Sequence, residues 1–110
     1  MGGQLTKPQS EMEKSVRDAV VALVEGLTPG QLEGVTVDAV LRHRAFRDHA
    51  DITRIALDKT VECKTSEEEA DFAMRAHIAA MISLHSHQLA LSTLLDVLGH
   101  IPVVPERTSN

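Results

Sequence analysis

Residues 67–98 read EEEADFAMRAHIAAMISLHSHQLALSTLLDVL and contain neither glycine nor proline. The stretch opens with three glutamates, directly after Thr65 and Ser66. Thr65 or Ser66 can act as the N-cap of a helix, and the glutamates place negative charge at the positive end of its dipole. Gly99 follows directly and Pro102 lies just beyond, which is typical of a helix end. The stretch predicts one uninterrupted helix, about 48 Å long at 1.5 Å per residue.

Apolar side chains cover a wide arc of this predicted helix, so it must contact several neighbours. A second copy of the chain is an economical source of one neighbour, and we expect a homodimer. The alternative is a monomeric hairpin with an exposed apolar face, which is uncommon among monomers. The residues predicted to lie at the dimer interface are Ala76, Ala80, Ser83, His87, Ala90 and Leu94.

Two further helices are predicted upstream. Ser10 and Glu13 form a capping-box pattern before a helix over about residues 11–25, which Gly26 ends. Residues 28–31, TPGQ, start another helix. We expect Gly34 to interrupt it after a short turn.

Thr36 is then expected to cap a second long helix of about 24 residues, and the chain is expected to reverse direction between residues 59 and 65. The predicted fold is therefore all-α: two long antiparallel helices preceded by a shorter N-terminal helix, in a homodimeric helical bundle. We expect a flexible tail over residues 1–9, a single helical domain over 10–103 and a flexible tail over 104–110.

The composition excludes several classes of protein. Of 110 residues, 43% are apolar and 25% charged, as in ordinary globular domains, and the net charge of −5 disfavours a dedicated nucleic-acid binder. Cys63 is the only cysteine, so no intrachain disulfide is possible. Neither a membrane span nor a signal peptide is recognisable. We expect a cytoplasmic protein.

No pattern in the sequence indicates catalysis. There is no glycine-rich phosphate loop and no nucleophile elbow, and no two of the six histidines are spaced i,i+4 as a helical metal site requires. We expect neither an enzyme nor a cofactor. The basic segment over residues 42–47 alternates with aspartates at i,i+4 spacing, which favours a solvated, salt-bridged face over a DNA-reading helix.

Three segments carry a family resemblance: GLTPGQLE at residues 26–33, VTVDAVLRHR at 35–44, and LHSHQ followed by ALSTLLDVLGHIP within 84–102. In this order and spacing they resemble the TraM family, the quorum-sensing antiactivators of conjugative plasmids in the Agrobacterium and Rhizobium group. The resemblance covers about residues 17–103. Residues 1–9, 59–69 and those after 103 show little to match.

The resemblance implies an all-helical homodimer that binds TraR, a LuxR-type activator requiring an acyl-homoserine lactone, and blocks it from its promoters. It places the partner-binding surface on Leu23, Leu27, Leu32 and Pro102. Ordinary core packing remains open for Leu23, and a helix stop for Pro102. The alternatives are a small DNA-binding plasmid-transfer regulator that uses the basic cluster Arg42–Arg47, and a purely structural helical dimer.

Overall fold

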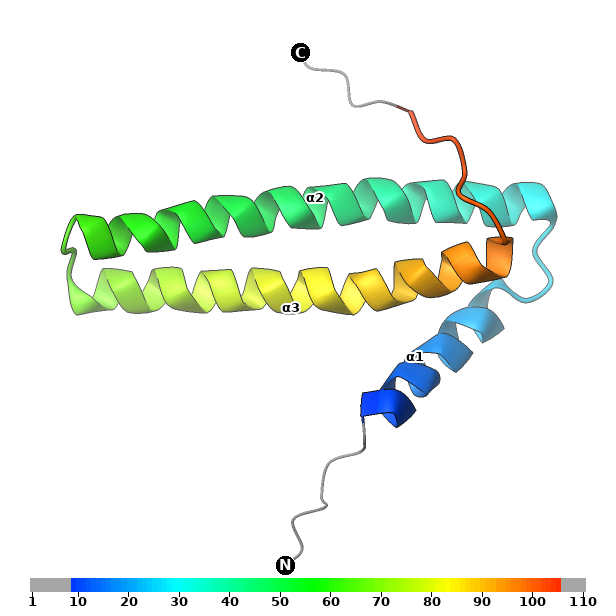
Figure 1. Ribbon diagram of the computed structural model, residues 1–110, viewed down its shortest axis with the longest axis horizontal. Helices are drawn as coiled ribbons and strands as arrows, with labels where there is room; N and C mark the ends of the chain where they lie inside the picture. Colours follow the sequence, from blue (N-terminus) through cyan, green and yellow to red (C-terminus); the bar gives the residue numbers. More distant parts are fainter. Residues whose placement is uncertain (1–8, 106–110) are drawn as a thin grey trace, which may run out of the picture. The chain divides into compact units, whose positions relative to one another are not determined.

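The computed structural model describes residues 9–105, which form three helices (Figure 1). These are α1 (Gln9–Val24), α2 (Pro29–Glu62) and α3 (Glu67–Leu98). The described residues include no strand, which confirms the predicted all-α class. The predicted bounds of α3 match the structure at both ends.

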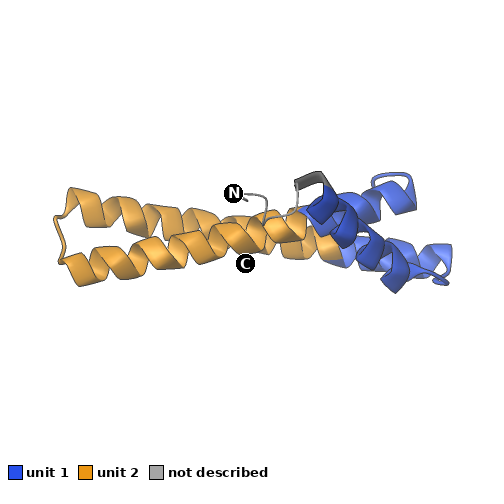
Figure 2. Cartoon of the chain, turned by 90° about the horizontal axis from the view of Figure 1, so that it is seen from below, with its two compact units in different colours: residues 1–38, 89–110 blue, residues 39–88 orange. Residues whose placement is uncertain are grey.

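The chain divides into two compact units (Figure 2). Unit 1 comprises residues 1–38 and 89–110, and unit 2 comprises residues 39–88. The helices α2 and α3 each contribute to both units. Unit 1 also holds α1 and the segment after α3.

The start of α1 differs from the expectation by two residues. The helix already includes Gln9, whereas the capping-box pattern predicted a start at about residue 11. The end agrees, because Gly26 adopts a positive φ of 86° two residues after Val24. The predicted tails over 1–9 and 104–110 otherwise fall mostly outside the described residues.

The predicted break at Gly34 is wrong. One helix of 34 residues runs through this position, and Thr36 does not cap a new one. Thr36 is instead fully buried, and its hydroxyl donates a hydrogen bond of 2.8 Å to the Leu32 carbonyl inside α2. A glycine costs a helix only about 1 kcal/mol relative to alanine. Burial of neighbouring residues such as Thr36 and Ala39 is sufficient to offset that cost.

The turn between α2 and α3 agrees with the expectation. Lys64 has a positive φ of 51°, and Ser66 rather than Thr65 caps α3, since its hydroxyl accepts a hydrogen bond of 3.2 Å from the Glu69 amide. In unit 2 the two helical segments on either side of this turn lie side by side. Thr53 of α2 and His77 of α3 meet there at 3.0 Å.

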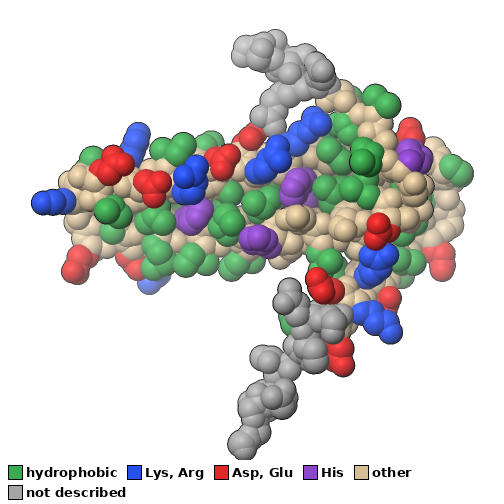
Figure 3. All heavy atoms as spheres, viewed as in Figure 1, with side chains coloured by type: hydrophobic (Ala, Val, Ile, Leu, Met, Phe, Trp, Pro, Cys, Tyr) green, Lys and Arg blue, Asp and Glu red, His purple; other side chains and the backbone are tan. Residues whose placement is uncertain are grey.

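Small side chains fill the interior while larger ones remain at the surface. Among the described residues, the buried aliphatic side chains are four alanines and two leucines, and three threonines are buried with them. Hydrophobic side chains reach the surface along both helices of unit 2 (Figure 3). The large exposed ones in this unit are Leu41, Ile52, Ile55, Val61, Phe72, Met74, Ile78 and Ile82.

Helix α3 is long and apolar enough to cross a membrane, judged by length and composition alone. The core helix of a soluble protein also passes this test, but such a helix is mostly buried. In α3, only 22% of the most apolar window is buried within this chain. Most of this window is therefore not buried in the single chain.

Candidate partner-binding surface

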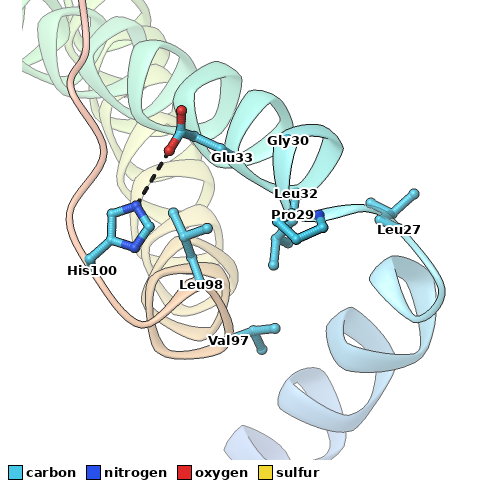
Figure 4. A pocket seen from close by; sticks show the side chains of 8 residues that line it. All are labelled: Leu27, Pro29, Gly30, Leu32, Glu33, Val97, Leu98 and His100. Carbon is cyan, nitrogen blue, oxygen red and sulfur yellow. Dashed lines mark hydrogen bonds and ion pairs between the residues drawn. The ribbon is translucent and has the colours of Figure 1, made fainter.

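Unit 1 contains an open, mainly apolar pocket of about 410 Å³. Figure 4 shows the side chains that line it, which come from two stretches far apart in the sequence, residues 27–33 and 97–100. The lining residues are Leu27, Pro29, Gly30, Leu32, Glu33, Val97, Leu98 and His100.

The turn between α1 and α2 presents one wall of this pocket, and a capping box fixes its shape. The Thr28 hydroxyl accepts a hydrogen bond of 3.1 Å from the Gln31 amide, while the Thr28 amide donates one of 3.0 Å to Oε1 of Gln31. This reciprocal pair satisfies two amides that the start of α2 would otherwise leave unpaired. The same turn places Leu27 on the lip of the pocket and Leu32 inside it.

The end of α3 presents the opposite wall. Gly99 has a φ of 87°, and its amide donates a hydrogen bond of 2.9 Å to the Leu95 carbonyl, which closes the helix. This ending leaves Val97 and Leu98 on the pocket and turns the chain so that His100 reaches α2. There, Nε2 of His100 lies 3.3 Å from Oε1 of Glu33.

The contact between His100 and Glu33 is polar and exposed to solvent, since each side chain is more than half accessible. It is an ion pair when the imidazole is protonated and a hydrogen bond when Nε2 alone carries the proton. Neither state closes the pocket. The pocket is thus an apolar hollow with one acidic and one imidazole group at its rim.

An ion pair connects α1 to the end of α3 within unit 1. Nη1 of Arg17 lies 2.9 Å from Oδ2 of Asp96, and both side chains are about half exposed. Exposed pairs of this kind contribute less than about 1 kcal/mol. The pair therefore orients α1 more than it stabilises the unit.

The four predicted partner-binding residues fall in three different environments. Leu27 and Leu32 meet at the pocket, while Leu23 projects from α1 with 81% of its surface exposed. Exposure of this degree argues against core packing for Leu23. Pro102 is buried. Its side chain packs within the chain, and its role in partner binding stays a prediction.

Sequence reasoning missed four apolar residues of this region. Val97 and Leu98 line the pocket, and Ile101 and Val103, on either side of Pro102, are 82% and 94% exposed. All four belong to or border the segment that carried the family resemblance, but only the structure shows which of them is accessible.

The six predicted dimer residues lie mostly on the covered side of α3. Ala80 and Leu94 are buried within the chain, Ala76, His87 and Ala90 are half-buried, and only Ser83 is exposed. The larger apolar side chains that α3 leaves exposed in unit 2 are Phe72, Met74, Ile78 and Ile82. An interface with another chain would bury more apolar area by covering these four side chains than by covering the six predicted residues.

The lining of the pocket is mainly apolar, and its ionisable side chains are Glu33 and His100. Within residues 9–105 no group of three or more histidine, cysteine, aspartate or glutamate side chains is placed to hold a metal ion. An open hollow with leucine, valine and proline walls suits the apolar side chains of another protein.

Comparison with known proteins gives a consistent assignment. The family described as "Prokaryotic Transcriptional repressor TraM" matches residues 3–103. A relative from Agrobacterium fabrum (strain C58 / ATCC 33970), named "Transcriptional repressor TraM", is 36% identical over 83 residues, covering 76% of this chain and 79% of the relative. One of the same name from Rhizobium radiobacter is 36% identical over 85 residues, covering 77% and 81%.

No solved structure matches the chain significantly. The family match spans nearly the whole described region, including both walls of the pocket, and the two relatives agree with it. The chain therefore belongs to the TraM family of prokaryotic transcriptional repressors.

Proposed function

We propose that this protein is a quorum-sensing antiactivator that binds the LuxR-type activator TraR and prevents it from binding DNA, which represses conjugal transfer genes. It acts in the cytoplasm, without a cofactor and without catalysis. The names of its relatives support the repressor part of this proposal. The observation that carries the partner-binding part is the apolar pocket of unit 1.

The pocket supports a protein partner because it combines residues from two regions that the family resemblance implicates. Leu27 and Leu32 come from the turn and the start of α2, and Val97 and Leu98 come from the end of α3. Apolar side chains in a concave surface are the usual anchors of protein interfaces. The exposed Leu23 of α1 enlarges the apolar area that unit 1 offers.

The charge balance supports inhibition without DNA contact. With a net charge of −5 the protein gains nothing from the counterion release that drives phosphate binding. It is, however, complementary to the basic DNA-binding module of an activator. Binding that module in a pose incompatible with the duplex prevents promoter recognition.

The protein acts as a homodimer in this proposal, as an antiparallel helical bundle. The support is the exposed apolar face of unit 2, where Ile78 and Ile82 stand one turn apart on α3, and Ile52 and Ile55 on α2. A second copy covers such a face by presenting the same residues, as a twofold interface requires.

A gel-shift titration tests the proposal. Purified TraR with its lactone and operator DNA is challenged with increasing amounts of this protein, beside a lane that lacks TraR. We expect the TraR–DNA band to disappear and the lane without TraR to show no shift. A shift in that lane would instead favour the DNA-binding reading with Arg42–Arg47.

Two substitutions test whether the loss of the TraR–DNA band depends on the apolar surface of unit 1. Leu32→Ser changes the pocket, and Leu23→Ser changes a side chain so exposed that the fold does not depend on it. Each substitution is expected to raise, by about tenfold or more, the concentration of this protein that abolishes the TraR–DNA band. Removal of an anchor residue from a protein interface has an effect of this size. Met12→Ser, at an exposed methionine of α1 that does not line the pocket, is the matched control, and an equal loss there would refute the assignment to the pocket.

A further inference from the structure

Two histidine rings stack in unit 2. His43 of α2 and His87 of α3 have ring centroids 5.9 Å apart and planes inclined by 18°. Phe46 of α2 lies against His87 with centroids 5.1 Å apart. Imidazole and phenyl rings from the two helices therefore contact one another here.

Both imidazoles have a buried Nδ1 atom without a hydrogen-bond partner. A neutral ring tolerates this because the proton can reside on Nε2, which leaves Nδ1 as an unused acceptor. A protonated ring carries a hydrogen on both nitrogens. Protonation therefore places a buried, unpaired N–H donor at this contact, which costs more than an unused acceptor.

The surroundings of the pair add to this cost. On α2, Arg42 and Arg44 are adjacent to His43 in sequence and Arg47 follows one turn later. The aspartates at 38 and 48 each stand five positions from His43, about 140° round the helix. The net charge of these groups on α2 is positive.

Helix α3 supplies no carboxylate to compensate. It has none between Asp71 and Asp96, and His85 is the nearest other titratable group to His87 on this helix. Burial, His43 and Arg42 together hold the pKa of His87 below its ordinary value of 6.5. The ring is thus neutral near pH 7, in agreement with the stacked geometry.

We propose that the His43–His87 pair is an acid-sensitive contact that holds α2 and α3 together in unit 2 and loosens when the rings are protonated. The stabilisation is complete above the ordinary histidine pKa, because His87 is then neutral in the folded and in the unfolded chain. It is lost as the pH falls through the lower folded pKa of His87, since the unfolded chain takes up the proton first. The inference concerns unit 2 alone and does not depend on TraR.

A neighbouring histidine provides an internal contrast. The Thr53 hydroxyl donates its only hydrogen to the Ala50 carbonyl at 2.9 Å, so its oxygen must accept the 3.0 Å hydrogen bond from Nδ1 of His77. Nδ1 of His77 therefore carries a proton in the neutral ring already. Protonation of His77 at Nε2 leaves this hydrogen bond intact, which is the opposite of the situation at His43 and His87.

The experiment is urea unfolding of the full chain, followed by circular dichroism between pH 8 and 5.5 at one protein concentration. The unfolding equilibrium constant is expected to be flat at high pH and to rise below pH 6.5 by up to about tenfold per pH unit for each proton taken up. His87→Leu and His43→Leu are each expected to flatten that rise. His85→Leu, an exposed histidine on the same helix, is the matched control and should leave it unchanged.

Equal pH dependence in wild type and His87→Leu, or equal flattening in His85→Leu, would overturn the proposal. Should a leucine variant fail to fold, a histidine NMR titration of the wild type decides the matter. We expect the His87 ring to titrate below the ordinary pKa of 6.5, and the two stacked rings to lose their mutual ring-current shift on protonation. If both rings keep that shift at pH 5.5 while only the oligomeric state changes, the pair is not the acid-sensitive element.

Discussion

The substitution Ile82→Ser tests whether the exposed apolar face of unit 2 binds a second copy of the chain. Complete burial of an isoleucine side chain contributes about 1.5–3 kcal/mol, and 62% of Ile82 is still exposed in the single chain. Covering that remainder is worth about 1–2 kcal/mol. A twofold interface contains the residue twice, so the loss per dimer is about 2–4 kcal/mol.

This loss corresponds to a rise of roughly thirty- to several-hundred-fold in the dimer dissociation constant. Serine is chosen because its helix propensity is close to that of isoleucine, so that α3 itself is barely affected. Sedimentation equilibrium over a range of protein concentrations provides the measurement. Helix content by circular dichroism should stay unchanged.

Leu23→Ser is the matched control, because Leu23 is even more exposed but belongs to α1 in unit 1. It is expected to leave the dimer intact and to weaken only the antagonism of TraR. The reasoning is refuted if Ile82→Ser dimerises as tightly as the wild type, or if Leu23→Ser dissociates the dimer to the same degree.

Three smaller predictions concern the local structure. Gly34→Ala should raise the free energy of unfolding by about 0.5–1 kcal/mol, since the position is helical and open space surrounds the new Cβ; a lower melting temperature would contradict this. Thr28→Ala should cost about 1 kcal/mol in urea unfolding by removing the cap of α2, and no change would show that the cap is dispensable. Arg17→Ala should cost less than about 1 kcal/mol, and less still in 1 M salt; a salt-independent loss would mean that the Asp96 pair is not responsible.

The helix ends were predictable where a specific residue is required by backbone geometry. Gly26 and Gly99 both adopt the positive φ that ends a helix, and Ser66 caps α3 as its pattern indicates. Gly34 was not predictable in the same way. Its local cost is small, and the packing of the surrounding turns of α2, which no local pattern reveals, decides whether the helix continues.

The candidate site was predictable only in part, for a similar reason. Leu27 and Leu32 came from the family resemblance, and both line the pocket. That Val97 lines the same pocket depends on how the end of α3 packs in unit 1, across more than sixty residues of sequence. The stacking of His43 on His87 depends likewise on the register of two helices, which spacing along one helix cannot supply.

The distribution of side-chain sizes connects the fold to association. The interior uses alanine and threonine, whereas isoleucine, valine and phenylalanine are exposed along the helices. Small residues permit close helix packing but bury little apolar area, so one chain obtains only part of the hydrophobic free energy that its sequence contains. The rest becomes available when another protein covers the exposed side chains. In the proposed homodimer, the exposed apolar side chains would therefore contribute to both association and stability, and the stability of the fold would depend on protomer concentration.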